Sequence, residues 1–186
     1  MRDPMEFLFQ AKERELALDA LIAGLDYPDG RPTWVLTFPG LDGVRGLVPP
    51  SEAGLPDKNL MPRFVGQDVK VKVKGIDREN GLAACSVREA MAEAAERMLP
   101  KLAENPERVW DAVVRCVVPG QDGQPPRLLV DVGGVLAEVP RSQAAISLTR
   151  PLSEQHRPGS AVRLKITRVD PQNGLVEASI RKALPD

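Results

Sequence analysis

The sequence predicts a mainly β protein: two five-stranded antiparallel barrels in tandem, each preceded by a helical segment. The chain repeats itself, because the segment G-Q-D-V-K-V-K-V-K-G-I-D that begins at Gly66 has a counterpart beginning at Gly159, in register and without a gap. Each copy alternates apolar and charged residues, which is typical of a strand. Each copy also holds five short apolar stretches with a longer connection between the third and the fourth, a pattern that favours a small closed barrel.

The repeat extends over most of the chain and defines its domains. Leu18–Ile22 aligns with Trp110–Val114, and Gly46–Ser51 aligns with Ala137–Ser142. Units of roughly 75 to 95 residues are long enough for separate hydrophobic cores. We therefore expect a helical lead-in at residues 1–16, a first barrel at 17–87, a connecting helix at 88–107 and a second barrel at 108–183.

The first three strands predicted in each unit are apolar stretches bounded by turn sequences. Pro-Asp-Gly-Arg-Pro follows the first stretch of the first unit, and Pro-Gly-Gln-Asp-Gly-Gln-Pro-Pro follows that of the second. The predicted strands are Leu18–Leu25, Thr33–Phe38 and Val44–Val48 in the first unit, and Trp110–Val118, Arg127–Val132 and Val135–Val139 in the second.

The fourth strand shows the clearest period of two. Val69, Val71 and Val73 point toward one face, and the three lysines between and after them point toward the other. Val162, Leu164 and Ile166 repeat the inward set. Asn80-Gly81 and Asn173-Gly174 then predict tight hairpin turns with positive backbone angles, each followed by a fifth strand. Asp77 and Asp170 precede these turns, where an aspartate commonly caps its own backbone.

Two helical segments are predicted, Phe7–Leu16 and Arg88–Ala103. The second carries a stripe of Met, Ala and Leu at helical spacing, which either packs on a barrel or binds a partner, and we favour packing. Pro100 should kink or end this helix, because proline lacks the backbone N–H that an inner turn requires.

Composition limits the class of function. The 186 residues are 42% hydrophobic, which is ordinary for a globular protein, and no apolar run approaches the roughly 20 residues of a membrane span. The N-terminal residues do not resemble a signal peptide, so we expect a cytoplasmic location and no membrane partner. The net charge of −1 is unusual for a strong general nucleic-acid binder. From residue 108 onward, however, the chain has 11 basic and 8 acidic residues, which makes the second repeat the better anion binder.

No pattern of catalytic or metal-binding residues is found. Cys85 and Cys116 lie in apolar stretches without CxxC spacing, so we expect buried, reduced thiols. His156 is the only histidine, and its polar neighbours predict an exposed loop. No nucleophile elbow or phosphate-binding glycine loop appears. The sequence therefore predicts a binding protein that is not an enzyme, without cofactor, metal or small-molecule substrate.

The pattern of both repeats resembles the S-one RNA-binding domain, the repeated module of the largest bacterial small-subunit ribosomal protein. The resemblance is carried by the order Gly-x-x-Val-x-Val-x-Val-x-x-Ile-Asp-x-x-Asn-Gly-x-x-x-x-Ser, by the segment from Gly43 to Glu52, and by Val130–Val135. It implies a barrel of the oligonucleotide-binding type and single-stranded RNA as the ligand, with strands two and three as the binding face.

The residues that the family uses for recognition are mostly replaced in both units. The resemblance implies two aromatic rings, a histidine, an aspartate and a basic residue. Only the aspartate positions match, as Asp77 and Asp170. The aromatic positions hold Pro32 and Val35, or Pro126 and Leu129; the histidine positions hold Pro49 and Pro140; and the basic positions hold Leu82 and Leu175. Without stacking, RNA binding should be weak, should depend on charge and should respond steeply to salt.

Several other residues are candidates for RNA contact. Lys70, Lys72 and Lys74 form an outward basic row, with Arg163 and Lys165 in the matching strand, although such a row is also ordinary for a solvated strand face. Arg127, Arg141 and Arg181 would lie nearer the family's binding face. Tyr27 is the best candidate for an exposed ring, whereas Trp34 either belongs to the core or lies at a stacking position on the edge.

The sequence leaves two functions open. The first is binding of single-stranded RNA or the ribosome through the two barrels, which we prefer. The second is a protein-interaction module, whose barrels dock a ribosomal or other protein partner without binding RNA. The missing stacking rings and the near-neutral charge favour the second, and the resemblance favours the first.

Overall fold

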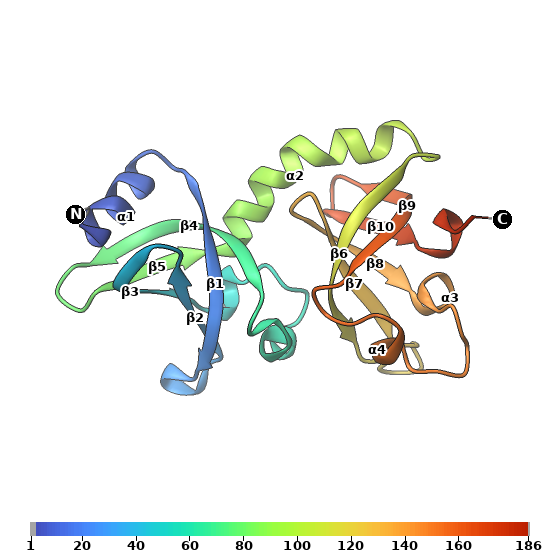
Figure 1. The fold of residues 1–186 in the computed structure, drawn as a ribbon, viewed down its shortest axis with the longest axis horizontal. Coiled ribbons are helices and arrows are strands. Elements are labelled where there is room, and N and C mark those ends of the chain that lie inside the picture. The colour runs from blue at the N-terminus through green and yellow to red at the C-terminus, as the bar shows by residue number, and fades with distance from the viewer. Residues whose placement is uncertain (1–2, 186) are drawn as a thin grey trace. The chain divides into compact units, whose positions relative to one another are not determined.

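The protein folds into two units, each containing a closed five-stranded barrel (Figure 1). A computed structural model describes residues 3–185, so the first two residues of the predicted lead-in lie outside the described part of the chain. The first unit extends to Glu93 and the second begins at Ala94. The predicted fold class, two small mainly β barrels in tandem, is confirmed.

The first unit begins with helix α1 (Pro4–Glu13), which ends before the predicted Leu16. Its strands are β1 (Ala17–Asp26), β2 (Thr33–Phe38), β3 (Leu41–Val48), β4 (Asp68–Asp77) and β5 (Leu82–Ser86). Three short 3-10 helices lie in the connections: η1 (Pro28–Gly30), η2 (Pro50–Glu52) and η3 (Lys58–Phe64).

The second unit repeats this order. Its strands are β6 (Val109–Val118), β7 (Arg127–Val132), β8 (Val135–Pro140), β9 (Ala161–Asp170) and β10 (Leu175–Ser179), and its short helices are α3 (Arg141–Ala144), α4 (Leu152–Gln155) and η4 (Arg181–Ala183). In both barrels the third and fifth strands pair in parallel, as in Gly46 opposite Ala83, while the other pairs are antiparallel. This parallel pair closes the ring and leaves no free sheet edge.

The same backbone clamp closes the first strand onto the fourth in each barrel. Gly66 donates its N–H to the carbonyl of Ile22 (2.7 Å), and Gly159 donates to Val114 in the same way (2.7 Å). Both glycines have positive φ, +93° and +87°. Only glycine adopts this conformation without steric cost, which explains why both copies of the repeated segment begin with glycine.

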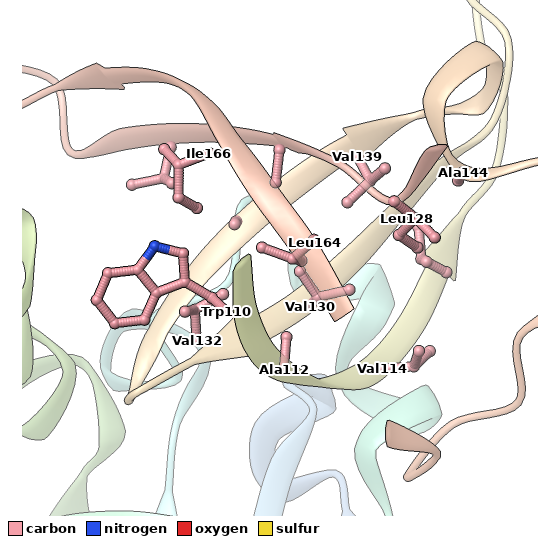
Figure 2. Close-up of a cluster of buried hydrophobic side chains, with 14 of the residues drawn as sticks. Trp110, Ala112, Val114, Leu128, Val130, Val132, Val139, Ala144, Leu164 and Ile166 are labelled. Atoms are coloured by element: carbon pink, nitrogen blue, oxygen red, sulfur yellow. The ribbon is translucent and has the colours of Figure 1, made fainter. Parts of the chain in front are cut away.

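Alternating side chains fill the interior of each barrel. In the second unit Trp110, Ala112 and Val114 of β6 point inward with Leu128, Val130 and Val132 of β7. Figure 2 shows Trp110 at one end of this cluster and Leu128, Val139 and Ala144 toward the other. In the first unit Val69, Val71 and Val73 of β4 are buried, as their alternation predicts.

The hairpin turns before the fifth strands differ from the prediction. Each turn contains four residues, and only the glycine, Gly81 or Gly174, has positive φ. Asn80 instead donates its side-chain amide to Asp77 Oδ2 (2.8 Å), and Asn173 donates to Asp170 in the same way (2.8 Å). The asparagine thus contributes a side-chain hydrogen bond, and the prediction that both Asn and Gly supply positive angles was wrong.

Helix α2 (Val87–Glu104) connects the two units. It continues through Pro100 to Glu104, so the proline does not end it as one prediction allowed. Val87 and Ala90 are buried in the first unit, and Met98 and Leu99 pack against the core of the second. The apolar stripe therefore serves packing, as the sequence favoured.

The turn of the β7–β8 hairpin packs closely against the second half of α2. Gly133 and Gly134 form its two-residue turn, both with positive φ, and the Gly134 N–H donates to Asp131 Oδ1 (2.8 Å). A Cβ at Gly134 would lie 2.8 Å from that of Ala94, and one at Gly133 would lie 2.7 Å from the Met98 side chain. These glycines therefore allow both the turn and the close approach of the helix.

Candidate nucleic-acid interface

Trp34 belongs to the core, and its inclusion among the RNA-binding candidates needs correction. The side chain is fully buried, and its Nε1 donates to the carbonyl of Met61 (2.9 Å). Its ring lies 5.7 Å from that of Phe64. A base cannot stack on a ring that is enclosed on all sides, so of the two interpretations of Trp34 the structure supports the core.

Tyr27 lies at the surface, as predicted. It precedes η1, its side chain is 55% exposed, and its backbone N–H donates to Asp26 Oδ1 (2.8 Å). The other tryptophan, Trp110, is covered by the guanidinium of Arg108, which lies 3.8 Å from the ring centroid. Among the aromatic candidates, only Tyr27 therefore presents an open ring to a ligand.

The lysine row of β4 is neutralised by carboxylates. Lys70 pairs with Asp19 (2.5 Å), Lys74 pairs with Glu89 (2.6 Å), and Lys72 pairs with Glu93. The hydrogen bond from Lys72 to Glu93 raises the pKa of Lys72, so this ammonium stays charged within its pair. These three lysines face outward as predicted, but a phosphate would have to compete with the carboxylates.

The matching row of β9 is also paired, although more loosely. Arg163 lies 3.8 Å from Asp111, and both side chains are largely exposed. Lys165 lies 3.2 Å from Glu107. Exposed pairs of this kind contribute little free energy, about 0 to 1 kcal/mol, because water and salt screen them.

A third group of cations gathers at one end of the second barrel, where β7 begins and β8 ends. Arg127 is opposite Pro140 in the β7–β8 register, and Arg141 follows directly in α3. Arg181 follows the end of β10, and Ile180 next to it donates its N–H to the Gln143 carbonyl of α3 (3.0 Å). Arg127, Arg141 and Arg181, which are far apart in the sequence, thus lie around one short helix.

The partners of these arginines differ. Arg127 Nε lies 3.1 Å from Glu138 Oε1, an ion pair without hydrogen-bond geometry. Arg141 donates to the backbone carbonyl of Leu148 (3.0 Å) and forms no ion pair with any described residue. Arg181 is exposed and has no acidic partner within residues 3–185. This end of the barrel therefore carries positive charge that the described residues do not balance.

A serine network at the same end of each barrel was not anticipated. Ser86 Oγ donates to Glu52 Oε1 (2.6 Å) and accepts the N–H of Glu89 (3.0 Å). Ser179 Oγ donates to Gln143 Oε1 (2.6 Å) and accepts the N–H of Lys182 in the same way (3.1 Å). Both serines are fully buried. The sequence signal was present, because each repeat ends its fifth strand with serine.

The two hairpin aspartates act as backbone caps, as predicted. Asp77 Oδ1 accepts the N–H of Asn80 (3.2 Å), and Asp170 Oδ1 accepts the N–H groups of Gln172 (3.2 Å) and Asn173 (3.4 Å). Hydrogen bonds from the asparagine side chains lower the pKa of both carboxyl groups. Their acceptor positions are directed at their own turns.

His156 is buried, which corrects the prediction of an exposed loop residue. It lies at the end of α4, is 5% exposed, and its Nε2 is 2.7 Å from the carbonyl of Ala144. Its polar neighbours remain outside while the ring links α4 to α3. The free cysteines Cys85 and Cys116 are buried, as expected, and burial raises the pKa of the Cys85 thiol to about 12.

The chain is similar in sequence to a ribosomal protein. No profile of a known protein family matches the chain. Small ribosomal subunit protein bS1 of Staphylococcus aureus strain MRSA252 is 30% identical over 193 aligned residues, which cover 95% of this chain and 46% of that protein. The protein of strain COL gives the same values. The chain is thus similar to ribosomal protein bS1 over nearly its whole length, and its two barrels are of the S-one type. It spans about half the length of these relatives.

Solved structures of similar proteins are more distant. GSP13 from Bacillus subtilis is 26% identical and covers 41% of this chain and 55% of its own, with a TM-score of 0.34. A multidomain protein with nucleic acid binding domains from Streptococcus pneumoniae is 11% identical, covers 89% of this chain and 50% of its own, and has a TM-score of 0.42.

Neither S-one-type barrel carries an aromatic platform at the positions that the family uses. Proline and aliphatic residues occupy those positions, in or next to β2, β3, β7 and β8, and Trp34, the tryptophan of the first barrel, is in the core. Within residues 3–185, no group of three or more His, Cys, Asp or Glu residues could hold a metal ion. In the same part of the chain no helix is long and apolar enough to cross a membrane. The candidates for RNA contact that remain are therefore Tyr27 and the cationic side chains described above.

Proposed function

We propose that this S-one-type protein is a non-enzymatic RNA-binding protein, which binds single-stranded RNA weakly, alone or as part of the ribosome. The observation that carries the proposal is the homology to ribosomal protein bS1, which covers 95% of the chain and includes both barrels. By its name, that relative is a protein of the small ribosomal subunit. RNA is therefore the ligand that we expect for this chain.

The weakness of the binding follows from the missing rings. Stacking of a base on an aromatic side chain contributes about 1 to 3 kcal/mol per base. Two absent platforms in a barrel therefore cost at least about 2 kcal/mol, which is roughly a 30-fold lower affinity. What remains is attraction between arginine side chains and phosphates, and this attraction falls steeply with salt because added salt reduces the gain from releasing counterions.

Fluorescence anisotropy with a labelled single-stranded RNA tests the proposal. We expect saturable binding at low salt, and a linear decrease of the logarithm of the affinity with the logarithm of the salt concentration. The double substitution Arg127→Glu and Arg141→Glu should weaken binding by at least about tenfold, because two attractive charges become repulsive. Absence of saturable binding in the unmodified protein at low salt would refute the proposal.

A second candidate function, docking of a protein partner, is favoured by one surface loop. Ile146 and Leu148 are 67% and 66% exposed. The loop is nevertheless held firmly, because the Gln155 side chain accepts the N–H groups of Ile146 (2.8 Å) and Ser147 (2.9 Å) and donates to two carbonyls. Two exposed apolar side chains on an ordered loop are suited to an apolar protein surface.

A pull-down from nuclease-treated lysate distinguishes the second candidate. A protein partner that docks on this loop should remain bound after RNA is digested, and the double substitution Ile146→Ser and Leu148→Ser should release it. Partners that disappear with the RNA would instead support RNA binding.

A further inference from the structure

The same end of the two barrels differs in charge, and the difference begins at one position. Glu52, directly after β3, accepts the hydrogen bond of Ser86 and also pairs with Arg88 through both carboxylate oxygens (3.1 and 3.2 Å). In the second unit Gln143 takes the place of Glu52 and keeps the equivalent bond from Ser179 (2.6 Å). Gln143 is neutral, so Arg181, the counterpart of Arg88, has no carboxylate to pair with among residues 3–185.

The neighbouring positions increase this difference. In the second unit Arg127, Arg141 and Lys182 lie at the same end of the barrel as Arg181, and Glu138 is the carboxylate that pairs there, with Arg127. The first-unit counterparts of these three cations are Thr33, Pro50 and Glu89. One end thus presents four cations against one carboxylate. The other presents Arg88 and Lys74 against the carboxylates of Glu52 and Glu89, with which they pair.

We propose that the second unit binds RNA phosphates at the end formed by Arg127, Arg141, Arg181 and Lys182, and that neutral Gln143 keeps this end open. The corresponding end of the first unit is closed to RNA by Glu52. This inference rests on the proposed function and assigns RNA binding to one barrel and to one of its ends.

The chemistry of the cluster fits a phosphate chain. The guanidinium group presents several N–H donors in a plane and matches the oxygens of a phosphate. Arg141 is already oriented by the Leu148 carbonyl, and Arg181 follows a strand end that the Ser179 network holds in place. A side chain that is already held, as that of Arg141 is, loses less conformational entropy on binding than a free one. The lysine row of β4 is less suitable, because Lys70 and Lys74 each already pair closely with a carboxylate, at 2.5 and 2.6 Å.

The chain itself suggests the decisive substitution. Gln143→Glu is nearly isosteric, and Glu52 shows that a glutamate at this position accepts the serine hydrogen bond. The new carboxylate should pair with Arg181 as Glu52 pairs with Arg88, and the fold should be retained. We expect this variant to bind a fluorescein-labelled oligouridine of about 12 nucleotides roughly three- to tenfold more weakly at low salt. The salt dependence of the affinity should become shallower, its slope decreasing by about 0.7 for each phosphate that the variant no longer neutralises.

Matched variants make the result specific. Arg163→Gln removes one positive charge from the same barrel on β9, outside the proposed site, and its effect should stay below about twofold. Arg181→Gln should weaken binding as Gln143→Glu does, and it serves as a second test if Gln143→Glu lowers thermal stability. Glu52→Gln, the reciprocal change, should leave binding unchanged or strengthen it.

The outcomes separate this inference from the proposed function. If the unmodified protein does not bind the oligouridine, the proposed function fails. If it binds, but Gln143→Glu and Arg181→Gln weaken binding no more than Arg163→Gln, the proposed function stands and the assignment to this end is wrong. Weaker binding by Glu52→Gln would also contradict it. If polyglutamate binds with the same dependence on Gln143 while the RNA does not, the cluster is a site for an acidic protein, which overturns the inference.

Discussion

At the scale of single residues, position in the barrel decides which side chains can contact a ligand. Trp34 and Tyr27 are seven positions apart, yet one is fully buried and the other is half exposed. Strand alternation indicated the core for Trp34, since it shares the parity of Leu36 and Phe38. Its hydrogen bond to Met61 then fixes the indole against η3, so its role is structural.

Trp34→Phe should therefore destabilise the protein without altering RNA affinity. The substitution removes the Nε1 donor and leaves the buried Met61 carbonyl without its partner, which costs about 1 to 3 kcal/mol. Urea unfolding monitored by circular dichroism measures this loss. Tyr27→Ala is the control, because an exposed ring should change stability by less than about 0.5 kcal/mol. Equal stability of Trp34→Phe and the unmodified protein would contradict the core assignment.

At the scale of elements, turns and connections depend on contacts that the repeat pattern alone does not specify. The β7–β8 turn needs glycine for two reasons, positive φ and the close approach of α2. The hairpin after β4 needs only one glycine, and its asparagine bonds to Asp77. An Asn-Gly pair in a sequence therefore indicates a turn but not its length, since that depends on the strand register.

Gly134→Ala should cost more stability than Gly123→Ala. Both glycines have positive φ, which costs an alanine about 1 to 2 kcal/mol, but only at Gly134 would the new methyl group meet Ala94, at 2.8 Å. A Cβ at Gly123 would have no atom within 4 Å. We expect a further loss of about 1 kcal/mol or more at Gly134 from overpacking, measured by thermal unfolding. Equal losses of stability in the two variants would contradict this prediction and show that α2 shifts to make room for the new methyl group.

At the scale of the whole molecule, each unit has its own barrel and its own buried tryptophan. Trp34 reports on the first core and Trp110 on the second. We infer that the domains predicted from the repeat unfold as separate units, because each contains a closed sheet and a separate set of inward side chains.

Leu36→Ala tests this independence. The side chain is fully buried in the first unit, and its removal should cost about 2 to 5 kcal/mol there. In a Trp34→Phe background, unfolding followed by Trp110 fluorescence should keep its denaturant midpoint, while the circular dichroism curve gains an earlier transition. A matching shift of the Trp110 midpoint would show that the two units unfold together.

The amino-acid sequence by itself determined the barrels, their number and the location of nearly every strand. Periods of two and glycines at fixed places are local signals, and a repeated copy confirms each of them. The sequence also showed that the aromatic platform of the family is missing, since this needs only the residue at each family position. Arg127, Arg141 and Arg181 were named as candidates because the same family positions put them near the binding face.

Only the tertiary structure decided which charges are available. Lys70, Lys72 and Lys74 point outward as their alternation requires, but their partners Asp19, Glu89 and Glu93 come from β1 and α2, which the pattern of β4 does not reveal. The His156 ring is buried, where its Nε2 contacts the Ala144 carbonyl of α3. Gln143 matters because the fold brings it beside the residues that follow β10. Charge balance and burial depend on neighbours distant in the chain, and folding alone brings those neighbours together.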